Sequence, residues 1–239
     1  MKVIRALTLV LIHGLGLTSN IWRPLTSILD KKSITYSLPG HGHCTFSDFS
    51  WNGILKNLKE KLKHNTENSF TLVLHSFAGA ILPEIVSSDL KIKKIFFIES
   101  ILHIDDAVWT RALSEMTVES YNNWLLKFRS VSEITLRSQL IKKHSKKNIL
   151  LWSEGFRITD EVAIYTMALN LTKRLLTDEI GNSLKEASFP MLYLRGSKSR
   201  LSLTGKRFVE SCGVTIKNLP ESGHFPMLDN PSEIKNIID

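Results

Sequence analysis

Ser76 lies where a hydroxyl group could act as a nucleophile. It belongs to the segment Leu-His-Ser-Phe-Ala-Gly at residues 74–79, which follows an apolar run and precedes a segment with helical spacing. A sharp turn from a strand into a helix exposes a serine hydroxyl and directs the first N–H groups of the helix at an oxyanion. The segment therefore predicts acyl transfer to serine.

A serine hydroxyl is a poor nucleophile unless a base lies within hydrogen-bonding reach, and the base needs a group that fixes its tautomer and stabilises its charge. The best candidate base is His224. It lies in the motif Gly-His-Phe-Pro-Met-Leu at residues 223–228, just after the last expected strand. We predict that His224 takes the proton of Ser76.

The elements that must position these residues alternate between apolar strands and amphipathic helices. Continuous apolar strands separated by such helices are typical of a parallel sheet that is covered on both faces. The expected strands are Ala6–Ile12, Ile34–Leu38, Phe70–Leu74, Lys93–Ile98, Pro190–Leu194 and Val214–Leu219, and the expected helices are Asn20–Leu29, Trp51–Lys63, Ala78–Ser87, Leu203–Ser211 and a short one from Pro231.

The alternation breaks between residues 105 and 187, where no strand pattern is found. Four amphipathic segments occupy this region instead, which predicts a four-helix cap inserted into an α/β core made of residues 1–104 and 188–239. The four segments are Ala107–Met116, Val118–Phe128, Ile134–Lys143 and Glu161–Leu176.

Four loops carry a resemblance to the α/β-hydrolase family that extends over essentially the whole chain. They are His-Gly-Leu-Gly at 13–16, Pro-Gly-His-Gly at 39–42, the serine turn, and the motif at 223–228. The resemblance implies a mostly parallel sheet with an inserted helical cap. It also implies an oxyanion hole formed by the backbone N–H groups of Leu15 and Phe77. The chain starts at what looks like the family's third strand, so we expect the usual N-terminal hairpin to be absent or very short.

The turn departs from the family's Gly-x-Ser-x-Gly pattern, because Leu74 and Ala78 replace the glycines. Alanine adds only a methyl group, whereas leucine needs local room. Gly79 and Ala80 keep the start of the helix small. We expect a turn that is little distorted and still functional.

The chain departs further from the family's pattern at the acid that should support His224. In the resembling family it usually follows the strand at 190–194 in a Gly-x-x-Asp pattern, but here Ser199 stands at that position. Some haloalkane dehalogenases of the family place the acid at the end of the preceding strand, where this chain has Glu99. We predict Glu99 as the acid. Asp105 and Asp106 are the alternatives, and a missing acid would mean an inactive site.

These residues predict a serine hydrolase that cleaves a carboxylic ester or a thioester through an acyl-enzyme on Ser76. Haloalkane dehalogenases and epoxide hydrolases of the family use Asp at that position, which argues against their chemistry. Two other readings remain open. One is a lyase, cyclase or C–C bond enzyme that uses the same residues as a base, and the other is an inactive ligand-binding homologue.

No cofactor is expected for this chemistry. His41, His43 and Cys44 lie close together in sequence but lack a second pair of ligands, so we predict no metal site. The two cysteines, Cys44 and Cys212, show no disulfide spacing and are expected to be free thiols in a reducing compartment.

The net charge is +8, from 31 basic and 23 acidic residues. Lysines cluster at 91–94 and 142–147, either as a solvated surface or as a docking patch for an acidic partner, such as a carrier protein, or for an anionic substrate. No module for nucleic acid accompanies the charge. Lys2 and Arg5 precede an apolar run as in a signal peptide, but that run is better explained as a core strand. We therefore expect a cytoplasmic protein without a membrane span.

Overall fold

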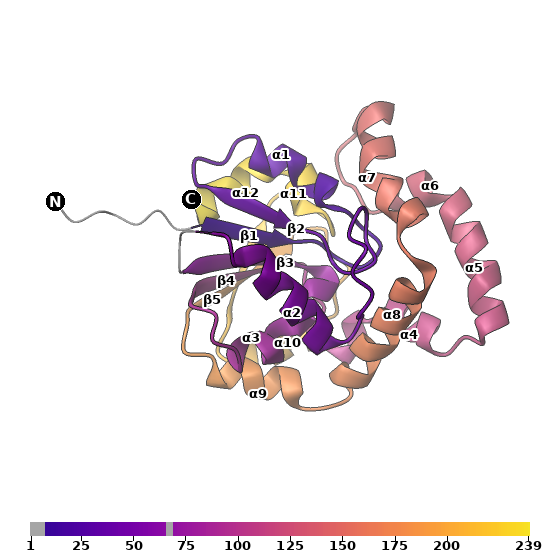
Figure 1. Cartoon of the computed structure of the whole chain (residues 1–239). Helices are drawn as coiled ribbons and strands as arrows, with labels where there is room; N and C mark the ends of the chain where they lie inside the picture. The colour runs from indigo at the N-terminus through magenta and orange to yellow at the C-terminus, as the bar shows by residue number, and fades with distance from the viewer. Residues whose placement is uncertain (1–7, 66–68) are drawn as a thin grey trace.

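A computed structural model describes residues 8–65 and 69–239 of the chain, and its centre is a six-stranded sheet (Figure 1). The strand order is β2-β1-β3-β4-β5-β6, and every neighbouring pair is parallel. This confirms the expected parallel α/β architecture. The strands are β1 (Thr8–Ile12), β2 (Ser33–Tyr36), β3 (Phe70–His75), β4 (Ile92–Ile98), β5 (Met191–Gly196) and β6 (Thr215–Leu219).

Helices cover both faces of the sheet (Figure 1). On one side, α1 (Arg23–Thr26) packs with α11 (Pro226–Asp229) and α12 (Pro231–Ile238). On the other side, α3 (Leu82–Val86) contacts both α2 (Trp51–Leu62) and α9 (Glu179–Glu186), and α10 (Leu203–Ser211) packs against β6. Every residue of β1 and β3 is buried, as the continuous apolar runs predict.

The register of the sheet decides which residues meet at its carboxyl edge. His75 at the end of β3 is paired with Ile98 at the end of β4, and Ile98 is paired with Leu194 in β5. Ser76 and Glu99 are therefore the first residues beyond two neighbouring strands. The two residues of the expected first strand that precede Thr8 lie outside the described residues.

Two helices are shorter than predicted, and each is interrupted in the same way. The segment expected as one helix at Asn20–Leu29 forms a 3-10 helix at Ser19–Trp22 followed by the single turn of α1. The segment expected at Ala78–Ser87 forms the 3-10 helix η2 (Ser76–Ile81) followed by α3. Pro24 and Pro83 lie in the first turns of α1 and α3. Proline lacks an N–H and is tolerated in an α-helix mainly in its first turn, so each α-helix restarts there.

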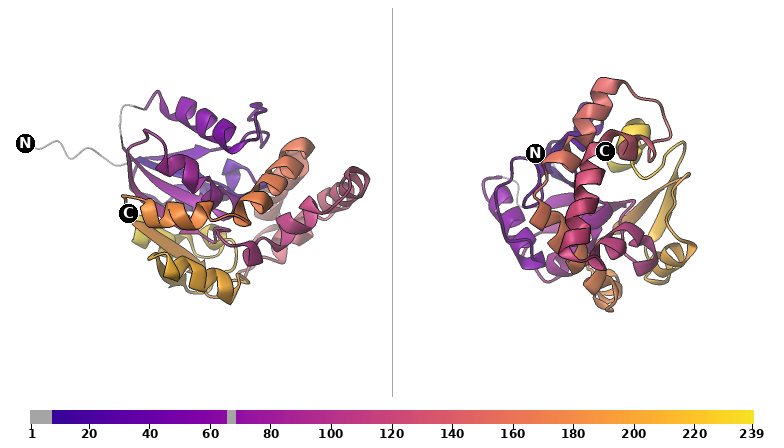
Figure 2. Two further views of the ribbon diagram at one scale, coloured as in Figure 1. Left: turned by 90° about the horizontal axis from the view of Figure 1, so that it is seen from below. Right: turned by 90° about the vertical axis from the view of Figure 1, so that its right-hand side faces the viewer.

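Residues 105–187 contain only helices among their regular elements, and α5, α6 and α7 lie beyond the carboxyl ends of the strands (Figures 1 and 2). Two of these helices, α7 and α9, were not predicted from the sequence. The prediction of a helix at Ile134–Lys143 is wrong beyond Arg137, where α6 ends. The helices not yet given bounds are α4 (Val108–Ser114), α5 (Val118–Ser130), α6 (Ser132–Arg137), α7 (Lys146–Ile158) and α8 (Glu161–Leu175).

Both cysteines, Cys44 and Cys212, are free thiols, as expected. No helix in the described ranges has an apolar stretch long enough to span a bilayer.

Candidate active site

Ser76 is the first residue after β3 and begins η2. Its φ of 54° lies in the left-handed region, which non-glycine residues rarely adopt and which is common at functional turns. The backbone at Gly14 packs closely against the serine, because a Cβ at Gly14 would lie 2.8 Å from the Ser76 Cβ. The strained turn presents the hydroxyl at the carboxyl edge of the sheet, and Gly14 leaves room for it.

The two replaced glycines of the serine turn are accommodated in the core. Leu74 is fully buried in β3 and Ala78 is buried in η2. The position that has no room for a side chain is Gly79, one residue after Ala78. A Cβ at Gly79 would lie 2.6 Å from the Ser100 Cβ. The small residue that this turn requires is therefore Gly79.

His224 stands between Ser76 and Glu99. Its Nε2 is 3.2 Å from the Ser76 Oγ, and its Nδ1 is 3.3 Å from the Glu99 Oε2. A carboxylate can only accept hydrogen bonds. The Nδ1–H therefore donates to Glu99, and Nε2 is left as the acceptor for the serine proton.

Glu99 is fully buried, and its carboxylate has several donors around it. The Gly196 N–H donates to Oε1 at 2.7 Å, and the Ser199 hydroxyl donates to Oε2 at 2.7 Å. Together with the His224 ring these hydrogen bonds compensate the burial of the charged group. Glu99 itself has a φ of 47°, so this turn is left-handed like that at Ser76.

The other two candidate acids do not contact His224. The Asp106 carboxylate accepts a hydrogen bond from the Ser202 N–H at 2.6 Å, and burial raises its pKa. Asp105 lies 3.8 Å from the His103 ring. Of the three carboxylates considered, Glu99 is the one that the structure places against the histidine.

The two amides expected to hold an oxyanion both border the same cavity as Ser76. Leu15 follows the close contact of Gly14 with the serine, and no described residue accepts a hydrogen bond from its N–H. Phe77 is the second residue of η2, where N–H groups have no partner within the helix. Both N–H groups are therefore placed to bind a negative oxygen.

Two buried histidines tie down the loop that carries Leu15. The His41 Nε2 accepts a hydrogen bond from the Gly16 N–H at 2.9 Å, and the His13 Nε2 accepts one from the Leu38 N–H at 3.3 Å. Burial lowers the pKa of His41 to about 4 and that of His13 to about 3. Both rings are therefore neutral at ordinary pH and act as acceptors that position the loop.

This gives an expected pH dependence of stability. The unfolded state binds a proton at His41 near pH 6.5, whereas the folded state binds it near pH 4. Stability should therefore fall as the pH drops through this window, by about 3 kcal/mol from His41 alone. His41→Gln keeps an acceptor for Gly16 but does not titrate. Urea unfolding at several pH values gives the free energy of unfolding as a function of pH. This free energy should fall less steeply with decreasing pH in the variant than in the wild type, and an equal fall would contradict the role of His41.

Asp229 joins the loop of His224 to the segment that follows α6. It is buried, and it accepts a hydrogen bond from the Gly223 N–H at 2.9 Å. Its other oxygen accepts from the Ile141 N–H at 2.9 Å and the Lys142 N–H at 3.1 Å. These two amides lie in the stretch that was wrongly predicted as helix, and Asp229 replaces the helical partners that they lack. Asp229 directly follows the motif at 223–228, and its role could not be expected from the motif alone.

A cavity of about 400 Å³ opens over Ser76. Residues at the carboxyl edge of the sheet border it on one side, among them Ser76, His224 and the two candidate oxyanion residues. The helices between residues 105 and 187 contribute apolar side chains, among them Trp109, Phe128 and Phe156, which contact one another in a row of rings. An apolar acyl or alcohol group would suit this space.

The chain as a whole is similar to known proteins. The family model described as "Alpha/beta hydrolase family" matches residues 9–236. Curated relatives include the pimeloyl-[acyl-carrier protein] methyl ester esterases of Legionella pneumophila strains Corby and Lens. Each is 27% identical to this chain, over 98% of the chain and 95% of the relative.

Solved structures with the same fold include an esterase from Exiguobacterium antarcticum, with a TM-score of 0.77 and 14% identity over 97% of this chain and 90% of that one. A bromoperoxidase from Bacillus anthracis has a TM-score of 0.76 and 13% identity, over 98% of this chain and 90% of that one. At these identities the likeness concerns the fold. The match to the family model covers nearly the whole sequence, and the protein belongs to the alpha/beta hydrolase family.

Proposed function

We propose that the protein is a serine ester hydrolase that works through an acyl-enzyme on Ser76. The observation that carries the proposal is the continuous chain from Ser76 Oγ through the His224 ring to Glu99 Oε2, with steps of 3.2 and 3.3 Å, at the floor of the cavity. A hydroxyl, a base and a carboxylate in this order activate serine for attack on a carbonyl carbon.

In this mechanism the Ser76 Oγ attacks the ester carbonyl while the His224 Nε2 takes its proton. The N–H groups of Leu15 and Phe77 hold the resulting oxyanion. When the tetrahedral intermediate collapses, the bond to the leaving alcohol breaks and the alcohol takes the proton from His224. Water then attacks the acyl carbon while His224 accepts a proton from it. The bond between the acyl carbon and the Ser76 Oγ breaks as His224 returns this proton to the serine, and the carboxylic acid is released. Glu99 stabilises the protonated ring in both halves.

We also propose that the chain consists of a catalytic core and an inserted cap. Residues 1–104 and 188–239 form the core that carries the reacting groups. Residues 105–187 form the cap, whose aromatic residues border the cavity from the other side. The last cap helix, α9, packs against α3 and so leads the chain back to the core.

For the substrate we propose the methyl ester of an acyl chain that is attached to a carrier protein. Curated relatives at 27% identity carry this activity in their names, and the aromatic lining of the cavity suits an aliphatic chain. Methoxide is a poor leaving group, so a methyl ester also requires a general acid that protonates the departing oxygen, and the protonated His224 ring supplies that proton.

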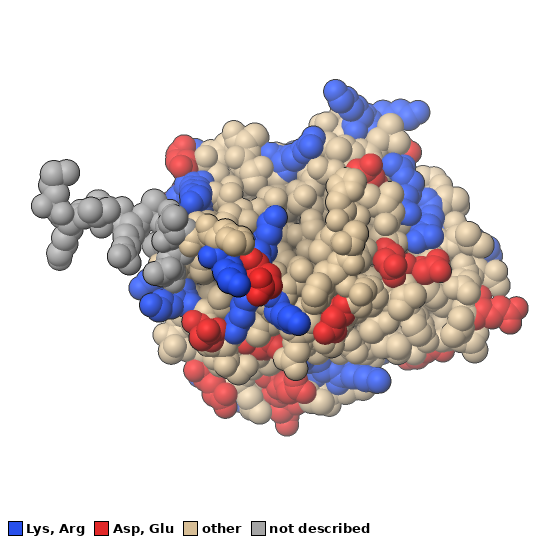
Figure 3. Space-filling model, in the orientation of Figure 1, with Lys and Arg blue, Asp and Glu red and all other residues tan. Residues whose placement is uncertain are grey.

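The docking patch that we propose for the carrier lies on the cap and consists of Lys142, Lys143, Lys146 and Lys147. All four side chains are exposed, and they directly follow Ile141, which borders the cavity. Figure 3 shows basic side chains gathered at the end of the molecule where Figure 1 places α7. Such a patch would attract an acidic partner to the mouth of the site.

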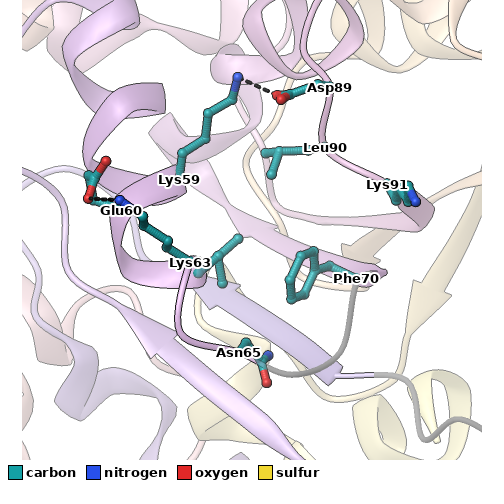
Figure 4. Close-up of a pocket in the computed structure, with 9 residues that line it drawn as sticks. Lys59, Glu60, Lys63, Asn65, Phe70, Asp89, Leu90 and Lys91 are labelled. Atoms are coloured by element: carbon teal, nitrogen blue, oxygen red, sulfur yellow. Dashed lines mark ion pairs between the residues drawn. The ribbon is translucent and has the colours of Figure 1, made fainter.

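The second lysine cluster, at 91–94, lies at the amino end of β4, on the edge of the sheet opposite Ser76. Figure 4 shows the shallow pocket beside it, in which Lys59 pairs with Asp89 and Lys63 with Glu60. Its distance from the active-site edge makes this cluster a matched control for the docking patch.

The test compares hydrolysis of a pimeloyl methyl ester carried by acyl-carrier protein with hydrolysis of the same acyl group on a small thiol. We expect a higher kcat/KM for the carrier form. Lys142→Glu with Lys143→Glu should lower kcat/KM for the carrier form about tenfold, because charge complementarity speeds association. The small substrate should be unaffected.

Lys91→Glu with Lys93→Glu makes the same change of charge at the opposite edge and should leave both rates unchanged. Equal losses in the two double variants would contradict the docking patch. If the enzyme hydrolyses p-nitrophenyl esters but neither methyl ester, the substrate class is wrong while the esterase chemistry stands.

A further inference from the structure

We propose that Ser199 is a positioning residue that holds Glu99 against His224. Its hydroxyl lies 2.7 Å from the Glu99 Oε2, and this is the oxygen that faces the His224 Nδ1 at 3.3 Å. The inference rests on the proposed role of Ser76, His224 and Glu99. It assigns a function to the residue that stands where the resembling family usually has its aspartate.

The loop after β5 fixes the direction of the Ser199 proton. The Ser199 Oγ accepts a hydrogen bond from the Leu201 N–H at 3.1 Å, so its own hydrogen is free to point at Glu99. The backbone N–H of Ser199 is held by the Gly196 carbonyl at 2.9 Å. The hydroxyl is therefore an oriented donor.

The same loop binds both oxygens of the carboxylate. The Gly196 N–H donates to Oε1 at 2.7 Å, while Ser199 donates to Oε2. A Cβ at Gly196 would lie 2.3 Å from the Gly223 carbonyl oxygen, so the loop also packs directly on the segment before His224. The same loop therefore contacts both the acid and the segment that carries the histidine.

A glutamate needs this support more than an aspartate would. Its side chain has one more rotatable bond, so without fixed partners the carboxylate could turn away from the imidazole. The two hydrogen bonds from the loop remove that freedom. This support lets the site use an acid that follows β4 while a serine stands in the place of the usual one.

The test is Ser199→Ala, measured with p-nitrophenyl butyrate. A hydrogen bond to a charged group is lost, so we expect kcat to fall about tenfold or more while KM stays within about twofold. Ser199→Thr keeps the hydroxyl and should restore most of kcat. A purely structural role would instead lower the melting temperature without separating kcat from KM.

A double-mutant cycle shows whether Ser199 acts through Glu99. In the Glu99→Gln background, Ser199→Ala should cause little further loss, because the carboxylate that it positions is already gone. Full additivity, or a Ser199→Ala enzyme with unchanged kcat, would overturn the inference. These outcomes are distinct from failure of the proposed function, which would appear as an active Ser76→Ala enzyme.

Discussion

Ser76→Ala is expected to lower kcat for p-nitrophenyl butyrate by at least about 10⁴-fold, which is the scale of losses when a serine nucleophile is removed. In the proposed mechanism the hydroxyl forms the covalent acyl-enzyme, and the His224 ring 3.2 Å away has no other serine to activate among its hydrogen-bonded partners. Substrate binding should persist, because the cavity walls are unchanged. Steady-state kinetics and a substrate-binding titration of the variant measure both effects.

Ser130→Ala, at the exposed end of α5, makes the same substitution away from the cavity and should leave kcat unchanged. Full activity of the Ser76→Ala enzyme would contradict the acyl-enzyme mechanism. It would favour chemistry in which His224 acts as a plain base, as in the lyase alternative. An inactive wild-type enzyme would instead favour a ligand-binding protein.

Glu99→Gln is expected to lower kcat by about 10³- to 10⁴-fold, as replacing a catalytic acid by its amide does in other serine hydrolases. Two physical effects combine. The amide carries no charge to stabilise the protonated His224, and its NH₂ group can donate to Nδ1 and so favour the wrong tautomer of the ring. Glu99 is fully buried, so water cannot reach this position to stabilise the protonated ring in place of the carboxylate.

The same kind of substitution at the other two candidate acids provides the control. Asp105→Asn and Asp106→Asn should each change kcat less than about threefold, because neither carboxylate contacts His224. If Asp106→Asn is inactive and Glu99→Gln is not, the acid has been assigned to the wrong residue. Thermal unfolding of all three variants separates lost chemistry from lost folding.

The sheet and the residues that meet in the candidate site could be predicted from the sequence because their signals are local. Buried strands appear as continuous apolar runs, and Ser76 and His224 lie in short motifs. Glu99 could be chosen because it ends the strand at which some haloalkane dehalogenases place their acid, and because a charged residue at the end of an apolar strand needs a partner. The register of β3 with β4 then places it beside Ser76.

The features that could not be predicted depend on distant contacts or on single residues within a helical pattern. The loop after α6 is held by Asp229, 88 residues after Ile141 in sequence, and helical periodicity gave no sign of it. The hydrogen bond from Ser199 to Glu99 joins residues 100 positions apart. Pro24 and Pro83 were visible in the sequence, and their effect on the helices was missed because the apolar spacing continues across them.

The most direct test of the central claim, that Ser76 is the acylated nucleophile, is covalent labelling with a fluorophosphonate followed by peptide mass mapping. Such a probe reacts with a serine only when a neighbouring base activates it. We expect one adduct per chain, on the peptide that contains Ser76, with loss of esterase activity in step with labelling and much slower labelling in Glu99→Gln. An enzyme that hydrolyses esters while Ser76 stays unlabelled would contradict the account.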